Sequence, residues 1–145
     1  MPSPQNLQKW TQWVLEQPFH RFVGLELVHQ EAGKAWCRFQ VSDGLTDMAG
    51  TLNAGLLHGL VEAACYLALL PMLDDDEHAS TIDLHVSVVR VAPKGARIAL
   101  RAEVMRKGRG VAFVRCEAQT AEGGAGTIAT ATVTKALGKA TAAQL

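Results

Sequence analysis

The chain has 145 residues, and its 14 basic and 14 acidic side chains leave a formal net charge of +0 at pH 7. This length suits one ordinary domain with a single core. Hydrophobic residues make up 48% and charged residues 19% of the chain, which is typical of globular proteins and excludes a largely disordered chain. The balanced charge also excludes an overall positive field for binding nucleic acid, so any anion site should be local.

The first residues and the apolar segments predict a cytoplasmic protein. Residues 1–5 carry neither the basic start nor the apolar run of a secretory signal. The longest apolar stretch, residues 63–73, is shorter than the roughly 20 residues that span a bilayer. The cysteines Cys37, Cys65 and Cys116 show no CxxC spacing and are odd in number, so we expect buried free thiols.

The first part of the chain predicts a helix followed by a hairpin. Apolar residues recur at steps of three and four over residues 5–17, which is typical of an amphipathic helix that ends before Pro18. Residues 22–30 and 34–41 flank a turn-like break at Gly33 and are expected to be two paired strands. Residues 42–50, rich in Asp, Gly and Thr, are expected to be a loop.

Residues 53–72 are expected to form one long buried helix. Its side chains are apolar nearly all the way round, so other elements should enclose it. Asn53 is a good N-cap, and Pro71 before three aspartates marks the end. His58 and Glu62 are its only Asp, Glu, Lys, Arg or His residues, so they stand out as candidate site residues.

After this helix the apolar period changes to two, which predicts strands. Four strands are expected, over residues 81–90, 98–104, 111–120 and 127–135. Glycine-containing turns separate the last three, at 107–110 and 122–124, and the turn at 92–95 precedes them. Residues 1–138 are therefore expected to form one domain, with 139–145 as a frayed tail.

This order predicts an α+β architecture in which a curved antiparallel sheet of about six strands wraps the long helix, with a short N-terminal helix besides. The edge strands of such a sheet have unpaired backbone N–H and C=O groups, which can pair with another copy of the chain. We therefore expect at least a homodimer, with a homotetramer built as a dimer of dimers as the alternative.

Residues 50–62, GTLNAGLLHGLVE, resemble the signature of the PaaI-like hotdog-fold thioesterases. That signature is a Gly, two apolar or small residues, His-Gly-Gly, and an Asp or Glu nine residues after the His. Here Asn53 takes the His position, Ala54 and Gly55 the two glycines, and Glu62 the acid. The order of elements also resembles the family over almost the whole chain.

A competing frame places His58 and Gly59 on the His-Gly of the signature. It fails on spacing, because Leu67 would then stand at the position of the acid and Leu60 would replace the second Gly. The adopted frame departs from the family at the His, which is Asn, and at the first Gly, which is Ala. An Asn can orient a carbonyl or a water but cannot shuttle a proton at neutral pH.

The resemblance implies a hotdog fold and hydrolysis of an acyl-CoA thioester with a short- or medium-chain or aryl acyl group. The implied catalytic residues are Glu62, as general base or nucleophile, and Asn53, and the N–H groups of Ala54 and Gly55 at the helix start suit an oxyanion. The remaining expected contacts are His58, Tyr66 and Thr81 to the substrate, and Arg90, Lys94, Lys107, Gly108 and Arg109 to CoA phosphates. No metal is expected, and coenzyme A enters only as part of the substrate.

The spacing of the two catalytic features predicts that a second protomer is needed. Ala54 and Glu62 lie eight helical residues apart, about 12 Å at 1.5 Å per residue. One thioester carbon cannot touch both. If both act on one substrate, Glu62 must approach the helix start of another protomer, which gives two shared sites per dimer.

Each candidate residue also has a purely structural interpretation. Glu62 could be a buried carboxylate paired with His58 one turn earlier, and His58 a packed core residue. Asn53 could serve only as a cap, Tyr66 only as core, and the basic residues only as solvated surface. His58 and Glu62 lack the third ligand that a metal site needs.

For the whole chain, two other functions remain open at this point. One is a noncatalytic acyl-CoA-binding protein on the same fold. The other is a hotdog dehydratase or hydratase, which would need a His base with a partner acid at a different spacing.

Overall fold

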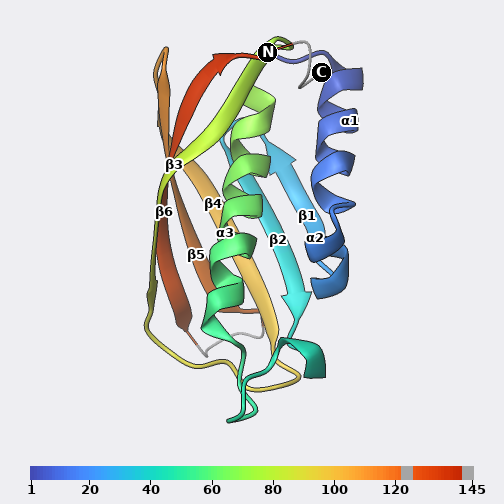
Figure 1. Cartoon of the computed structure of the whole chain (residues 1–145), viewed down its shortest axis with the longest axis vertical. Helices are drawn as coiled ribbons and strands as arrows, with labels where there is room; N and C mark the ends of the chain where they lie inside the picture. Colours follow the sequence, from blue (N-terminus) through green and yellow to red (C-terminus); the bar gives the residue numbers. More distant parts are fainter. Residues whose placement is uncertain (122–125, 142–145) are drawn as a thin grey trace.

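The computed structural model describes residues 1–121 and 126–141, which form one curved antiparallel sheet with a long helix against its concave face (Figure 1). The sheet order is β1-β2-β4-β5-β6-β3, and all neighbours are antiparallel. The strands are β1 (Glu26–Glu31), β2 (Lys34–Gln40), β3 (Glu77–Val88), β4 (Arg97–Lys107), β5 (Val111–Thr120) and β6 (Thr127–Lys139). The helices are α1 (Pro4–Leu15), α2 (Pro18–Val23) and α3 (Ala54–Leu69), with 3-10 turns η1 (Asp43–Leu45) and η2 (Leu70–Met72). The predicted α+β architecture is confirmed.

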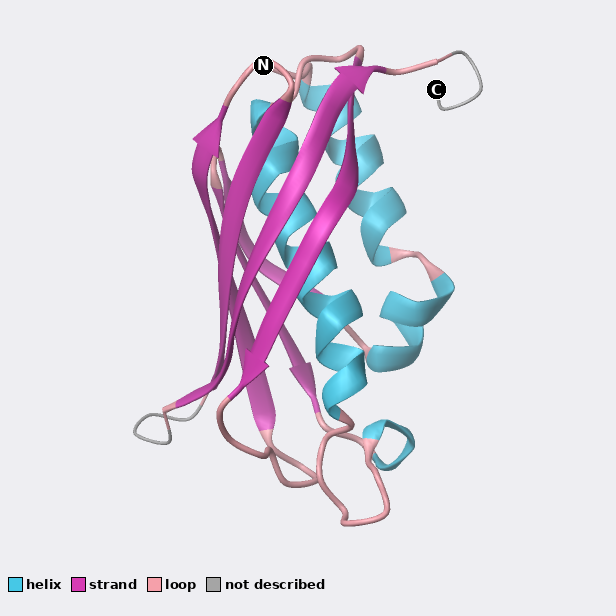
Figure 2. Ribbon diagram, turned by 60° about the vertical axis from the view of Figure 1, so that its left-hand side comes forward, coloured by secondary structure: helices cyan, strands magenta, loops and turns pink. Residues whose placement is uncertain are grey.

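Helix α3 lies against one face of the sheet (Figure 2), and alternate side chains of the strands are buried in the core between them. Cys37 and Phe39 of β2 and Val114 and Cys116 of β5 are nearly inaccessible to solvent. Such burial stabilises a fold by about 25 cal/mol per Å² of apolar surface, so this sheet–helix contact is its main driving force. All three cysteines are buried and free, as predicted.

Helix α3 is covered on its sheet side and open on the opposite side of its first turns. Leu57 and Leu60 are buried, whereas Ala54, Gly55 and His58 are exposed. The expectation of a fully enclosed helix is wrong for this face, because one sheet wraps only one side of a helix and α1 and α2 flank another (Figure 1). By length and composition α3 with η2 could cross a membrane, but 61% of it is buried inside the protein, as in a core helix.

Residues 22–25 do not belong to the first strand, contrary to the prediction from alternation. The chain forms a second short helix, α2, which begins at Pro18 and is followed by Gly24 in the left-handed conformation, at φ 77°. Proline at the first position and glycine just after the last are favoured at helix ends. Strand β1 therefore begins at Glu26, and Phe22 is 65% exposed on α2.

Strands β3 and β6, which pair at one edge of the sheet, are both longer than predicted. Strand β3 begins at Glu77 rather than at 81 and ends at Val88, and β6 continues to Lys139. The expected tail is wrong at residue 139, because Glu77 pairs with Lys139 in register and the Lys139 side chain bonds Asp76 at 2.7 Å. The predicted turn at 122–124 and residues 142–145 lie outside the described residues.

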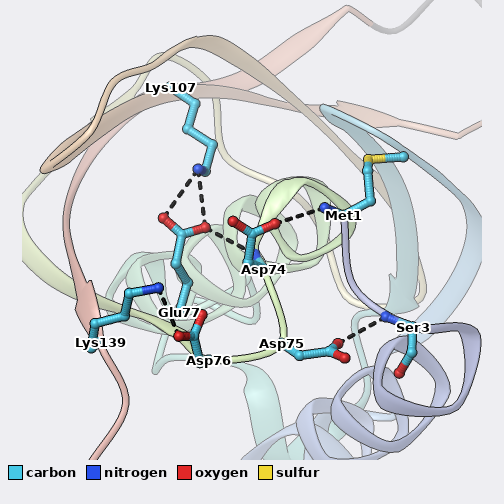
Figure 3. A network of polar contacts seen from close by, with 8 residues as sticks. All are labelled: Met1, Ser3, Asp74, Asp75, Asp76, Glu77, Lys107 and Lys139. Atoms are coloured by element: carbon cyan, nitrogen blue, oxygen red, sulfur yellow. Dashed lines mark hydrogen bonds and ion pairs between the residues drawn. The ribbon is translucent and has the colours of Figure 1, made fainter.

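The N-terminal segment is tied to the turn that enters β3 (Figure 3). The Ser3 backbone N–H donates to Asp75 at 2.8 Å, and the Met1 amino group donates to Asp74 at 2.7 Å. Glu77 of β3 pairs with Lys107 at the end of β4, 3.1 Å away, with both side chains largely buried. These contacts hold α1 beside the C-terminal end of α3, where it borders the candidate site.

Candidate active site

A tight loop sets the position at which α3 starts. Asp47 accepts hydrogen bonds from the backbone N–H groups of Ala49 (2.9 Å) and Thr51 (3.2 Å). The bond from the Thr51 backbone, with those from the other groups of this turn, holds the pKa of Asp47 below its usual range. Gly50 adopts φ 75°, a conformation that a β-carbon would strain. The loop thus restricts the position of Asn53, two residues after Thr51, at the start of the helix.

Asn53 caps α3, as predicted, and this cap determines which hydrogen-bond donors at the helix start remain available to a substrate. Its Oδ1 accepts the N–H of Gly55 at 3.0 Å. The expected pair of free N–H groups is therefore wrong for Gly55, because the capping bond occupies it. The Ala54 N–H and the Asn53 Nδ2 have no acceptor among the described residues, and Ala54 and Asn53 are both exposed. These two groups form the hydrogen-bond donors at the helix start.

Glu62, in the middle of α3, lies in a three-element contact. Its Oε1 accepts hydrogen bonds from Thr81 of β3 at 2.6 Å and from the ammonium of Lys135 of β6. Lys135 also donates to the Thr81 hydroxyl at 2.9 Å. The other carboxylate oxygen, Oε2, is buried and has no hydrogen-bond partner among residues 1–121 and 126–141. The predicted candidates Glu62 and Thr81 are therefore brought together.

The sequence-based prediction missed Lys135, which is 1% exposed. The signal was present in the strand period: Ala131, Val133 and Lys135 alternate on β6 and share the face toward α3. A lysine is rarely buried completely unless it is paired. A lone lysine in an inward apolar row thus predicts a buried acid opposite it, and α3 offers Glu62.

His58 does not pair with Glu62, so that structural alternative is wrong. His58 is exposed, while Glu62 bonds Lys135 and Thr81 instead. His58 lies one helical turn nearer the N-terminal end of α3, where the helix is open to solvent. In the described part of the chain, no group of three or more His, Cys, Asp or Glu residues is arranged to hold a metal.

A cavity of about 310 Å³ borders Glu62 and Lys135. Aromatic side chains from all three helices line it, namely Trp13, Phe19 and Tyr66. Burial raises the pKa of Tyr66, and the Lys135 ammonium lies 5.4 Å from the centre of its ring. This size is at the small end of ligand pockets, and a mostly apolar wall beside one acid suits an acyl group next to a reacting carbonyl.

The residues expected to bind CoA phosphates are split between the two ends of the sheet. Lys94 lies near the start of α3, since its N–H donates to the Gly50 carbonyl, and its side chain pairs with Asp43. Arg90 lies at the same end, beside Pro93 and Gly95, whereas Lys107 ends β4 and Gly108 and Arg109 follow it at the other end. That strand has 11 residues, which at about 3.3 Å each separates the groups by roughly 35 Å. Within one chain they are not a single phosphate site, because an extended strand stands between them.

Comparison with known proteins shows the family. The family model described as Acyl-CoA thioesterase N-terminal domain matches residues 42–136. Acyl-coenzyme A thioesterase 13 of Homo sapiens is 30% identical over 96 residues, which cover 66% of this chain and 68% of that protein. The protein of the same name from Pongo abelii matches equally. The chain therefore belongs to the hotdog-fold acyl-CoA thioesterase family, a family of thioester hydrolases.

Solved structures agree on the fold. A mutant of the phenylacetic acid degradation protein PaaI from Thermus thermophilus superposes with a TM-score of 0.75 and 26% identity, covering 83% of this chain and 98% of that one. A thioesterase family protein from Silicibacter pomeroyi gives a TM-score of 0.84 at 23% identity, covering 94% of this chain and 98% of that one. The predicted hotdog fold and the PaaI-like resemblance are thus confirmed.

Proposed function

We propose that this chain hydrolyses an acyl-CoA thioester to the free acid and CoA. The observation that carries the proposal is the position of Glu62, an acid that borders a mostly apolar cavity and whose Oε2 has no hydrogen-bond donor in the described part of the chain. Family membership supports the same reaction, since a matching relative is named an acyl-coenzyme A thioesterase. The acyl group is the part of the substrate that the cavity beside Glu62 would receive.

The chemistry requires a polarised carbonyl and an activated oxygen. The Ala54 N–H and the Asn53 amide would stabilise the negative charge that develops on the carbonyl oxygen. As a general base, Glu62 would take a proton from water while the water oxygen bonds to the thioester carbon. The C–S bond then breaks, and the proton passes from Glu62 to the CoA thiolate.

Glu62 as nucleophile is the alternative route to the same products. Its carboxylate would bond to the thioester carbon and release CoA, leaving a mixed anhydride. Water would then cleave the anhydride, giving the free acid and restoring the carboxylate. Both routes use the same residue and the same donors at the helix start.

We also propose that two copies of the chain build each site. The donors at Ala54 and the acid at Glu62 lie about 12 Å apart along one helix, so one chain does not bring both to one carbon. The surface around the helix start is open, and the edge strand β3 carries exposed apolar side chains, including Ile82 at 64% and Val88 at 43% exposure. Such a surface suits a symmetric partner, whose Glu62 would meet this helix start.

The direct test measures free thiol released from acyl-CoAs with linear acyl groups of increasing length and with aryl acyl groups. Wild type is expected to turn over at least one of them, and Glu62→Gln to be slower by a factor on the order of 10² or more. Glu31→Gln, an exposed acid on β1, is the matched control and should keep the wild-type rate. Circular dichroism checks folding, because Glu62→Gln leaves the buried Lys135 without its counter-charge.

Equal rates for wild type and Glu62→Gln, or no thiol release from any substrate, would overturn the proposal. Acyl-CoA binding in calorimetry without turnover would instead select a noncatalytic binding protein.

Subunit mixing tests whether the site is shared. Glu62→Gln and Asn53→Asp chains are co-refolded, and each is expected to be strongly impaired by itself. In a shared site, random pairing restores about a quarter of wild-type turnover, since half the dimers are mixed and each has one intact site. A mixture that stays as inactive as its parents, or a chain that sediments as a monomer while active, would contradict the shared site.

A further inference from the structure

Lys135 is an ammonium buried in the core of this protein. It is 1% exposed and lies on the inward face of β6, in a row with apolar side chains. A buried charge is retained only where it is paired and hydrogen-bonded. Lys135 meets this condition through Glu62 of α3 and Thr81 of β3, while the Tyr66 ring lies beside it.

The two donors converge on the same carboxylate oxygen. Lys135 and Thr81 both donate to Oε1 of Glu62, and Lys135 donates to the Thr81 hydroxyl at 2.9 Å. A hydroxyl that accepts from an ammonium on one side directs its single hydrogen to the other side. The short 2.6 Å bond from Thr81 to Glu62 fits that direction. The carboxylate is therefore held at one oxygen only.

The opposite oxygen, Oε2, has no such contact. It is buried without a hydrogen-bond partner in the described part of the chain. Proteins satisfy most buried polar atoms, and a catalytic role is one of the reasons for leaving one unsatisfied. The two oxygens of Glu62 thus differ in environment, although they are chemically equivalent in a free carboxylate.

We propose that Lys135 is a positioning residue for the acid of the active site: with Thr81 it holds Oε1 of Glu62 and so sets the orientation of the carboxylate that acts on the water or on the thioester. This inference rests on the proposed thioesterase function. In this role Lys135 acts on Glu62 and not on the substrate carbonyl. Its charge balances the carboxylate, and its position across from α3 fixes the carboxylate plane. Thr81, on the edge strand β3, restrains the same carboxylate oxygen.

If Lys135 and Glu62 formed a purely structural ion pair, the kinetic constants of the variants would differ from those expected of a positioning pair. Such a pair would stabilise the fold, but its loss would leave kcat unchanged in any variant that still folds. A positioning pair changes kcat and leaves KM nearly constant, because the substrate still binds while the acid is misaligned.

The test measures kcat and KM of Lys135→Met and Thr81→Val on the best acyl-CoA substrate. We expect kcat to fall on the order of 10² for Lys135→Met and about tenfold for Thr81→Val, with KM within about threefold of wild type. Thr81→Ser, which restores a hydroxyl, should recover part of the loss. Matched controls are Lys139→Met, on the same strand and paired with Asp76, and Thr132→Val, on the exposed face of β6.

A double variant separates action through Glu62 from a parallel role. Glu62→Gln with Lys135→Met should be no slower than Glu62→Gln alone, because Lys135 acts only through that acid. A folded Lys135→Met with wild-type kcat, or a double variant slowed by the product of both effects, would overturn the inference.

Failures of folding and of function are distinguishable from failure of this inference. Should Lys135→Met not fold, Thr81→Val decides alone, since Thr81 is exposed and its substitution keeps all charges. Wild-type kcat in Thr81→Val would then overturn the inference while leaving the thioesterase function standing. Absence of turnover in wild type itself would overturn the function and this inference with it.

Discussion

Gly59 of α3 lies directly beneath the ring of Phe19 of α2: a β-carbon at Gly59 would stand 2.6 Å from Phe19 Cε1. Real carbon atoms do not approach so closely, so only glycine lets the two helices meet here. Phe19 and Gly59 both line the cavity beside Glu62. The packing of two helices and the shape of the candidate acyl pocket therefore depend on the same contact.

Gly59→Ala is expected to lower the free energy of unfolding by about 1–3 kcal/mol through overpacking. The gain of about 1 kcal/mol in helix propensity offsets only part of this. Urea denaturation measures the change, and Phe19→Leu in the same chain should restore part of it by making room. Gly110→Ala, where a β-carbon meets nothing within 4 Å, is the control. A Gly59→Ala protein more stable than wild type would contradict the close contact.

Asn53→Asp separates capping from substrate polarisation. Asp caps a helix about as well as Asn, so the free energy of unfolding should change by less than about 0.5 kcal/mol. The carboxylate cannot donate a hydrogen bond to the thioester carbonyl, so turnover should fall by a factor on the order of 10–100. Asn53→Ala should lose turnover and also about 1 kcal/mol of stability. Wild-type turnover in Asn53→Asp would leave Asn53 with the capping role only.

Lys107→Met tests whether this lysine stabilises the fold rather than binding CoA. Lys107 and Glu77 are only 19% and 13% exposed, so breaking their pair should cost about 1–3 kcal/mol of unfolding free energy. KM for acyl-CoA should change by less than about twofold. Arg109→Met, two residues further along the chain, tests the hypothesis that this end of the sheet binds CoA phosphates. A raised KM in Lys107→Met with unchanged stability would reverse this assignment.

Asp75 links stability to pH at the N-terminal segment (Figure 3). The bond from the Ser3 backbone holds the pKa of Asp75 below its ordinary 3.8. A carboxyl with a lowered pKa in the folded state adds stability above its unfolded value, and this is lost as the pH falls through the folded value. Thermal unfolding of Asp75→Asn should thus depend less on pH below about pH 5 than wild type does. Asp83→Asn, on β3, is the control, and identical pH dependence of Asp75→Asn and wild type would contradict the link.

The thiols should be unreactive until the protein unfolds. Burial raises the pKa of Cys37 to about 12, and the bond with Cys116, together with burial, raises that of Cys65. Because the thiolate is the reacting form, a disulfide reagent at neutral pH should find no thiols in the native protein and all 3 in denaturant. The native protein would then add no background to the thiol-release assay. Rapid labelling of the native protein would show that the core opens around these residues.

The sequence alone determined the elements whose patterns are long and periodic. The apolar run over residues 53–72 could only be a core helix in a chain this short, and the period of two after it could only be strands. Asn53 as a cap followed from local spacing, since caps depend on near neighbours, whereas the resemblance to the family signature singled out Glu62 as the candidate acid. The same local rules left residues 22–25 ambiguous, because a short apolar alternation fits a strand and a helix alike.

Only the tertiary structure decided what Glu62 meets. Its partners Thr81 and Lys135 stand 19 and 73 residues further along the chain, and His58, its neighbour by sequence, faces solvent. The separation of Lys94 from Lys107, by contrast, was already implicit in the strand predicted over residues 98–104, which lies between their two turns. Local sequence determines the face of its own helix or strand on which a side chain lies. The packing of helices and strands against one another determines which side chains it then contacts. The environment of Glu62 depends on those contacts.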